Sequence, residues 1–129
     1  MSTVDRAYLM TGLGYGILGL ALGIHMAASK DHGQFVTHAH IMLAGFAVSF
    51  VYAVCHKLWL SAEPCRLGKL QFWLHQFGMA GIAVGLFLLY GQFLSPELLD
   101  PFLALSSIAF LLAMILMKVM IIRARKQSV

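Results

Sequence analysis

Four long apolar stretches divide this chain, and they constrain its fold more than any other feature. They run from Ala7 to Ala28, Val36 to Leu60, Leu67 to Phe93 and Pro101 to Ile122. Each exceeds the ~20 residues that a helix needs to cross the hydrocarbon core of a bilayer. Because lipid offers no hydrogen-bond partners to open backbone groups, stretches of this kind span as helices. The sequence therefore predicts an all-α integral membrane protein with four transmembrane helices.

Composition agrees with this interpretation. Hydrophobic residues make up 60% of the 129 residues, and charged residues make up only 11%. A soluble domain of this length cannot bury so much apolar surface. The breaks between the stretches are short, and no linker or repeat separates them. We therefore expect residues 1–129 to form a single four-helix transmembrane domain in contact with the lipid bilayer.

The positive charges lie mainly on one side of the predicted spans. Only Lys30 falls in a connection predicted for the other side, while the remaining basic residues are Arg6, Lys57, Arg66, Lys69, Lys118, Arg123, Arg125 and Lys126. By the positive-inside rule, both termini face the cytoplasm of a bacterial-type inner (plasma) membrane. The net charge of +4 then faces anionic lipid, so it gives no indication of a nucleic-acid partner.

Glycines recur at helical spacing in two of the spans. They are Gly12, Gly16, Gly19 and Gly23 in the first span, and Gly78, Gly81 and Gly85 in the third. A phosphate-binding loop would need a preceding strand, which these spans do not provide. Small residues three and four apart let a second membrane helix pack closely. We interpret both series as helix-packing faces.

Prolines mark the start of the fourth span. Asp100 followed by Pro101 is typical of an N-cap and the first residue of a helix. Ser95 and Pro96 are compatible with one extra helical turn before it. We therefore expect the fourth helix to begin at Pro101.

Two histidines stand two residues apart in the segment "FVTHAHIMLAGF", Phe35 to Phe46, at the start of the second span. Two residues on an α-helix correspond to a rotation of about 200°. His38 and His40 therefore face nearly opposite sides, and each needs a partner of its own. Ionisable groups inside a membrane span indicate function, and neutral imidazole is a common ligand of metals, haem iron included.

The run from Asp31 to Gly78 resembles helices nine to eleven of subunit I of the haem-copper oxidases. That family has an H-x-H pair at the outer end of its tenth helix, with an aspartate seven residues before the first histidine. Asp31 stands seven residues before His38. The segment "LGKLQFWLHQFG", Leu67 to Gly78, is similar to the segment that follows the tenth helix in the family. The chain thus resembles one four-helix arc of that subunit.

The resemblance implies a b-type haem protein. In the oxidases the first histidine of the pair binds the high-spin haem, and the second binds the low-spin haem. It follows from the resemblance that His38 and His40 are axial ligands of haem b iron, and that Asp31 organises the region of the haem propionates. The copper-binding histidines of the family come from helices absent here, and Lys30 replaces a usual histidine. We assign no catalytic residue and leave open whether the protein is an enzyme.

The other histidines have less defined roles. His25 lies near the level of His40 and is a candidate second axial ligand. His75, in the third span, is interpreted as a core residue bonded to Gln71, Gln76 or Trp73, with an iron ligand as the alternative. His32 and His56 are interpreted as solvated and interfacial residues.

A different function class stays open at this point. In it, the chain is a metal-binding or transport protein that takes Cu or Zn at the outer face. The ligands would be His25, Asp31, His32 and His38, because carboxylate and imidazole suit such ions. A haem absorption spectrum separates the two hypotheses.

Assembly offers an explanation for the two opposed histidines. The oxidase subunit consists of three arcs of four helices, and identical subunits normally close with cyclic symmetry. A homotrimer would rebuild this ring, with bis-histidine haem between His38 of one copy and His40 of the next. The glycine faces would allow the close contacts between copies. The expected function is electron transport, with a redox protein or a quinone as candidate partner.

Overall fold

The computed structural model describes residues 3–60 and 65–127, which form helices joined by short connections and contain no β-strand. Four helical segments are long and apolar enough to cross a membrane: Val4–Ser29, Phe35–Leu58, Arg66–Tyr90 and Pro96–Ala124. The predicted all-α fold with four candidate membrane-spanning helices is therefore confirmed. The predicted break at Ser61–Arg66 lies largely outside the described residues.

The second span is one continuous rod of three helical pieces. They are α2 (Phe35–His40), η1 (Ile41–Ala47) and α3 (Val48–Leu58). The middle piece is a π-helix, in which the amide of Val48 donates to the carbonyl of Leu43, five residues earlier. A π-helical turn holds more residues than an α-helical turn, and such insertions are frequent at functional sites. The histidine pair lies directly before this wider segment.

The remaining helices are α1 (Val4–Ser29), α4 (Cys65–Tyr90) and α5 (Pro96–Gln127). The predicted start of the fourth helix at Pro101 is wrong, because α5 begins at Pro96 and Pro101 lies inside it. The carbonyl of Ser95 accepts the amides of Leu98 and Leu99 at 3.1 and 3.2 Å, which closes the first turn. The fixed φ of a proline suits the first helical position, so Pro96 initiates the helix.

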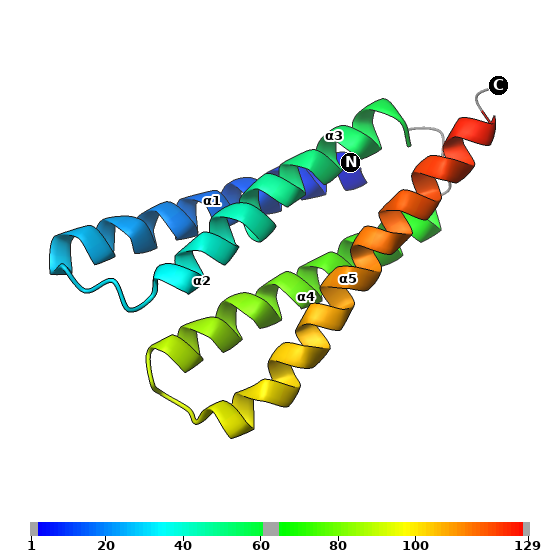
Figure 1. The fold of residues 1–129 in the computed structure, drawn as a ribbon. Coiled ribbons are helices and arrows are strands. Elements are labelled where there is room, and N and C mark those ends of the chain that lie inside the picture. Colours follow the sequence, from blue (N-terminus) through cyan, green and yellow to red (C-terminus); the bar gives the residue numbers. More distant parts are fainter. Residues whose placement is uncertain (1–2, 61–64, 128–129) are drawn as a thin grey trace.

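The helices form two hairpins, which Figure 1 shows side by side. One hairpin pairs α1 with the second span, and the other pairs α4 with α5. Helix α4 joins the hairpins, because it also contacts α1 and α2. Helix α1 begins and α5 ends at the same end of the molecule, here called the terminal end. The connection of residues 30–34 lies at the opposite end, here called the loop end.

The glycine series form packing faces, as predicted. A Cβ atom on Gly12 would lie 2.9 Å from Cβ of Ser49, and a Cβ atom on Gly78 would lie 2.7 Å from the backbone nitrogen of Phe110. Helix α1 thus packs on the second span, and α4 packs on α5, at distances that only glycine permits. Because these faces are filled by helices of the same chain, they do not supply contacts between copies. That part of the assembly hypothesis is wrong.

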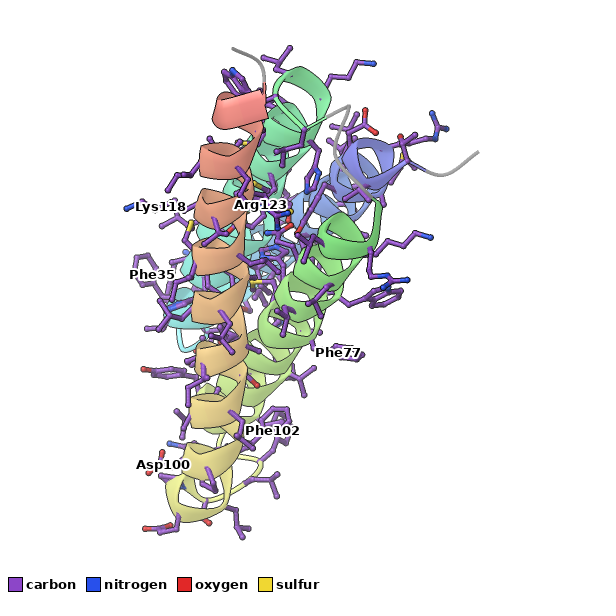
Figure 2. The ribbon with its side chains drawn as sticks, turned by 90° about the vertical axis from the view of Figure 1, so that its right-hand side faces the viewer. Phe35, Phe77, Asp100, Phe102, Lys118 and Arg123 are labelled. Atoms are coloured by element: carbon purple, nitrogen blue, oxygen red, sulfur yellow. The ribbon has the colours of Figure 1, made fainter. Side chains whose placement is uncertain are left out.

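Two apolar clusters hold the hairpins together, while large side chains cover the outside. The larger cluster consists of Tyr8, Tyr52, Ala53, Leu60, Met117 and Met120, and the smaller one of Ile41, Met79 and Ile82. Among the exposed side chains, Phe77 and Phe102 project from one side and Phe35 from the other (Figure 2). Exposed apolar side chains in all directions are those expected of helices that contact lipid.

Candidate functional site

His38 lies in α2 with its ring half-buried against α1. Its Nδ1 atom is 2.8 Å from the carbonyl oxygen of Gly19. A Cβ atom on Gly23 would lie 3.0 Å from Cε1 of His38, so the missing side chain there makes room for the ring. A carbonyl oxygen only accepts hydrogen bonds, so Nδ1 carries the proton. The lone pair of His38 is therefore on Nε2.

His40 has the same tautomer on the exposed side of α2. Its Nδ1 atom donates to the carbonyl oxygen of Val36 at 2.9 Å, one turn earlier in the helix. Metal-ligating histidines commonly donate one ring N–H to a carbonyl or carboxylate, which orients the ring and leaves the other nitrogen for the metal. Both imidazoles therefore present Nε2 as the atom that can bind a metal.

The two rings have different surroundings, as the spacing predicts. Helix α2 is α-helical up to His40, so the rotation of about 200° between the two positions holds. His38 faces α1, whereas His40 is exposed on the other side of the helix. A single ion is not held by both side chains of one chain.

The loop end carries the other polar groups predicted for the site. Oδ1 of Asp31 accepts the amide of Gly33 at 3.0 Å, and the amide of Asp31 donates to Oγ of Ser29 at 3.3 Å. Asp31 therefore caps the turn between the first two spans. His32 is exposed in the same turn, as predicted.

His25 is exposed on α1 and points away from His38. Gly23 faces the ring of His38, and His25 is two residues farther along, about 200° around the helix. Within residues 3–60 and 65–127, no three His, Cys, Asp or Glu side chains are close enough to hold one metal ion. The side chains considered for a copper or zinc site are thus not brought together within the described part of the chain, and that function stays the alternative.

A second polar cluster is buried toward the terminal end, around Gln71. Oε1 of Gln71 accepts the hydroxyl of Tyr8 and lies 3.3 Å from Nε2 of His56, which donates to it. The amide nitrogen of Gln71 donates to the carbonyl of Ala113 at 3.2 Å. One side chain thus links α1, α3, α4 and α5. His56 lies two residues from the end of its span, and its side chain is 7% exposed and stacks on Tyr8. Its interfacial depth stays a prediction.

His75 is fully buried next to this cluster. Its Nε2 atom lies 2.9 Å from Oγ of Ser49, and its Nδ1 atom has no hydrogen-bond partner in the described part of the chain. Its ring is packed among those of Tyr8, Tyr52 and Phe110. The core position is confirmed, but the hydrogen-bond partner is Ser49 of the second span and not one of the residues expected from α4. The alternative role as an iron ligand stays a prediction.

The sequence did not reveal the cluster around Gln71, although a signal for it exists. Tyr8, His56 and Gln71 are polar side chains within apolar spans, each within two turns of the terminal end. Polar groups at one depth in a membrane protein need partners, and they find them in one another. Depth, counted from the ends of the spans, would have grouped these residues.

Comparison with protein-family models, with curated proteins and with solved structures finds no significant match to this chain. Function is therefore inferred from the geometry of the histidines at the loop end and from the resemblance in the sequence.

Proposed function

We propose that the protein is a membrane b-type haem protein that transfers electrons, with haem iron bound by imidazoles at the loop end. The observation that carries this proposal is the shared tautomer of the histidine pair. Nδ1 of His38 and Nδ1 of His40 each donate to a backbone carbonyl, so that each Nε2 keeps its lone pair. The resemblance of this segment to subunit I of the haem-copper oxidases supports the same role.

His40 is the ligand that fits this role best. Its ring is exposed, so a large flat macrocycle can approach Nε2 from outside the chain. The ring of His38 lies against Gly19 and Gly23 of its own α1, which limits the space on that side. His38 stays the second candidate, on the strength of the resemblance.

A haem on His40 would lie on the outside of the chain, which favours sharing between copies. In the proposed assembly, each chain supplies one four-helix arc of an oxidase-like ring of three. A second copy then covers the haem and contributes the other axial ligand. The copies are placed in a bacterial-type plasma membrane, with both termini in the cytoplasm, in agreement with the charge distribution.

The bound haem would supply a one-electron couple, with a potential set by its axial ligands and its burial. This chain contributes the imidazoles, their orientation through carbonyl hydrogen bonds, and an apolar surface that keeps water away. Two imidazoles bound to the iron would leave no position on it for oxygen. Electron transfer with a redox protein or a quinone is therefore proposed in place of oxygen chemistry.

The absorption spectrum of the purified protein tests the proposal. We expect a Soret band that shifts on reduction by dithionite, with haem b identified as its pyridine haemochrome. His40→Ala should lose most of this absorbance, while His32→Ala, which changes an exposed loop histidine, should keep it. A colourless protein that contains stoichiometric copper or zinc would refute the proposal and restore the metal-binding alternative.

A further inference from the structure

Two exposed imidazoles lie on opposite sides of the first hairpin. Gly23 of α1 and His38 of α2 face each other across the hairpin. His25 and His40 each come two residues later in their helices, so each is turned by about 200° from that contact. Both are exposed within candidate membrane spans. Imidazole in contact with hydrocarbon is costly, so each side chain needs a partner outside its own hairpin.

The two imidazoles also lie at nearly one depth. The contacts of Gly23 with His38 and of Gly19 with Met42 set the register of the antiparallel helices α1 and α2. In this register His40 lies opposite Ala21. Ala21 comes four residues before His25, which is about 6 Å along the helix axis. Side chains lean toward the N-terminus of their own helix, and these helices run in opposite directions. His25 therefore leans toward the terminal end and His40 toward the loop end, which brings their rings closer in depth.

This placement restricts how copies can share a haem. Copies related by a rotation axis along the membrane normal place each residue at the same depth in the membrane. Two residues from different copies that bind one iron must therefore lie at nearly the same depth in the chain. His25 and His40 meet this condition from two different faces of the chain. A two-fold interface pairs one face with itself, whereas a head-to-tail ring pairs one face with the other. The arrangement therefore requires a ring, and three copies are the number that the proposed function already implies.

We propose that the second axial ligand of the haem bound by His40 is His25 of the neighbouring copy. This inference rests on the proposed haem function and specifies its site. His38 suits that role less well, because its ring is packed against Gly19 and Gly23 of its own α1, which limits the space around it.

The surroundings of the two imidazoles suit a haem between them. Ala21 and Ala28 lie one turn before and one turn after His25 and are exposed, so small side chains leave room for the macrocycle. Leu43, which is 66% exposed, lies one turn from His40 and provides an apolar contact. Lys30 at the loop end supplies a cation for propionate groups that leave the haem toward water.

Spectra of single variants give the first test. Wild-type protein should show a six-coordinate, low-spin haem spectrum. His25→Ala should convert it to a five-coordinate, high-spin spectrum or lose the haem, while His38→Ala should stay low-spin. If His25→Ala stays low-spin and His38→Ala does not, the inference is wrong while the haem function stands. If wild-type protein binds no haem, the proposed function fails first.

Complementation between copies gives the decisive test. His25→Ala and His40→Ala chains with different tags are co-expressed and purified through both tags in sequence. Low-spin haem should reappear at about one third of the interfaces, because each head-to-tail trimer that carries both tags has one interface of three with both ligands. The matched control combines His25→Ala chains with His25→Ala/His40→Ala chains, and no interface of that mixture has both ligands. Failure of the first mixture to recover low-spin haem, although both tags are retained, would overturn the inference.

Discussion

Gln71 shows how a single side chain can connect four membrane helices. Its oxygen accepts two hydrogen bonds, from Tyr8 and His56, and its nitrogen donates to the carbonyl of Ala113. The group is fully buried, and so is the tyrosine. The three partners come from α1, α3 and α5, so the amide fixes how both hairpins meet at the terminal end.

Replacement of Gln71 by leucine should therefore destabilise the protein. The change leaves Nε2 of His56 buried without its acceptor and leaves the hydroxyl of Tyr8 only the backbone carbonyl oxygen of residue 71, 3.3 Å away, at a cost of about 2 kcal/mol. Thermal unfolding in detergent measures the effect. Gln76→Leu is the matched control, because Gln76 is half-buried and bonds Tyr15 and Thr11, so the loss of stability should be smaller. Equal stability of wild type and Gln71→Leu would mean that the cluster contributes nothing to packing.

Helix packing in both hairpins depends on positions without a side chain. At Gly78 an added Cβ would meet the backbone of α5, with Ser106 carbonyl oxygen at 2.9 Å and Phe110 nitrogen at 2.7 Å. Backbone atoms cannot turn aside as a flexible side chain can, so the helices themselves would have to separate. Gly14 on α1, by contrast, has no atom within 4 Å of an added Cβ.

Gly78→Ala and Gly14→Ala should consequently have opposite effects. The first should destabilise the α4–α5 hairpin by about 1–3 kcal/mol through overpacking. The second should leave stability unchanged or raise it by up to about 1 kcal/mol, because alanine favours the helix over glycine. Unfolding of the two variants under the same detergent conditions makes the comparison. A stability of Gly78→Ala equal to that of Gly14→Ala would contradict the close packing of these helices.

The features that the sequence predicts well are those that one helix carries alone. Gly12 and Gly19 mark a packing face because their spacing is local, and the spans follow from length and hydropathy. The start of α5 was misjudged because Asp100 and Pro101 match a helix start, while Ser95 and Pro96 match it equally well. The bonds of Gln71 could not be predicted, since they depend on which faces of four helices meet.

At the loop end, too, local features of one helix were predictable and contacts between helices were not. The opposed directions of His38 and His40 follow from two residues of α-helix and were predictable. The contact of His38 with Gly19 and Gly23 was not, because it depends on the register between α1 and α2. That register also determines which face of the hairpin carries His25.

Both ends of the described chain lie at one end of the molecule (Figure 1). This follows from the even number of candidate membrane spans, because four crossings return the chain to the side where it started. The charges predict that this side is the cytoplasm. Cysteine variants of a chain without Cys55 and Cys65 test the orientation with a membrane-impermeant maleimide added to intact cells. His32→Cys and Ser95→Cys should be labelled, and Thr3→Cys should not. Labelling of Thr3→Cys alone would reverse the orientation.

The π-helical segment η1 lets the second span tolerate the deletion of one codon from its gene. Loss of one codon from a membrane helix normally misaligns one half of the helix against its neighbours. In Ile41–Ala47, however, the wide turns already hold residues in excess of the α-helical register, so a one-codon deletion can be absorbed as a return to that register. The loop-end half would then keep nearly the same direction relative to α3, whereas the loss of one residue from a regular α-helix would turn it by about 100°. A lineage could in this way lose one residue from the second span while His38 and His40 keep their neighbours.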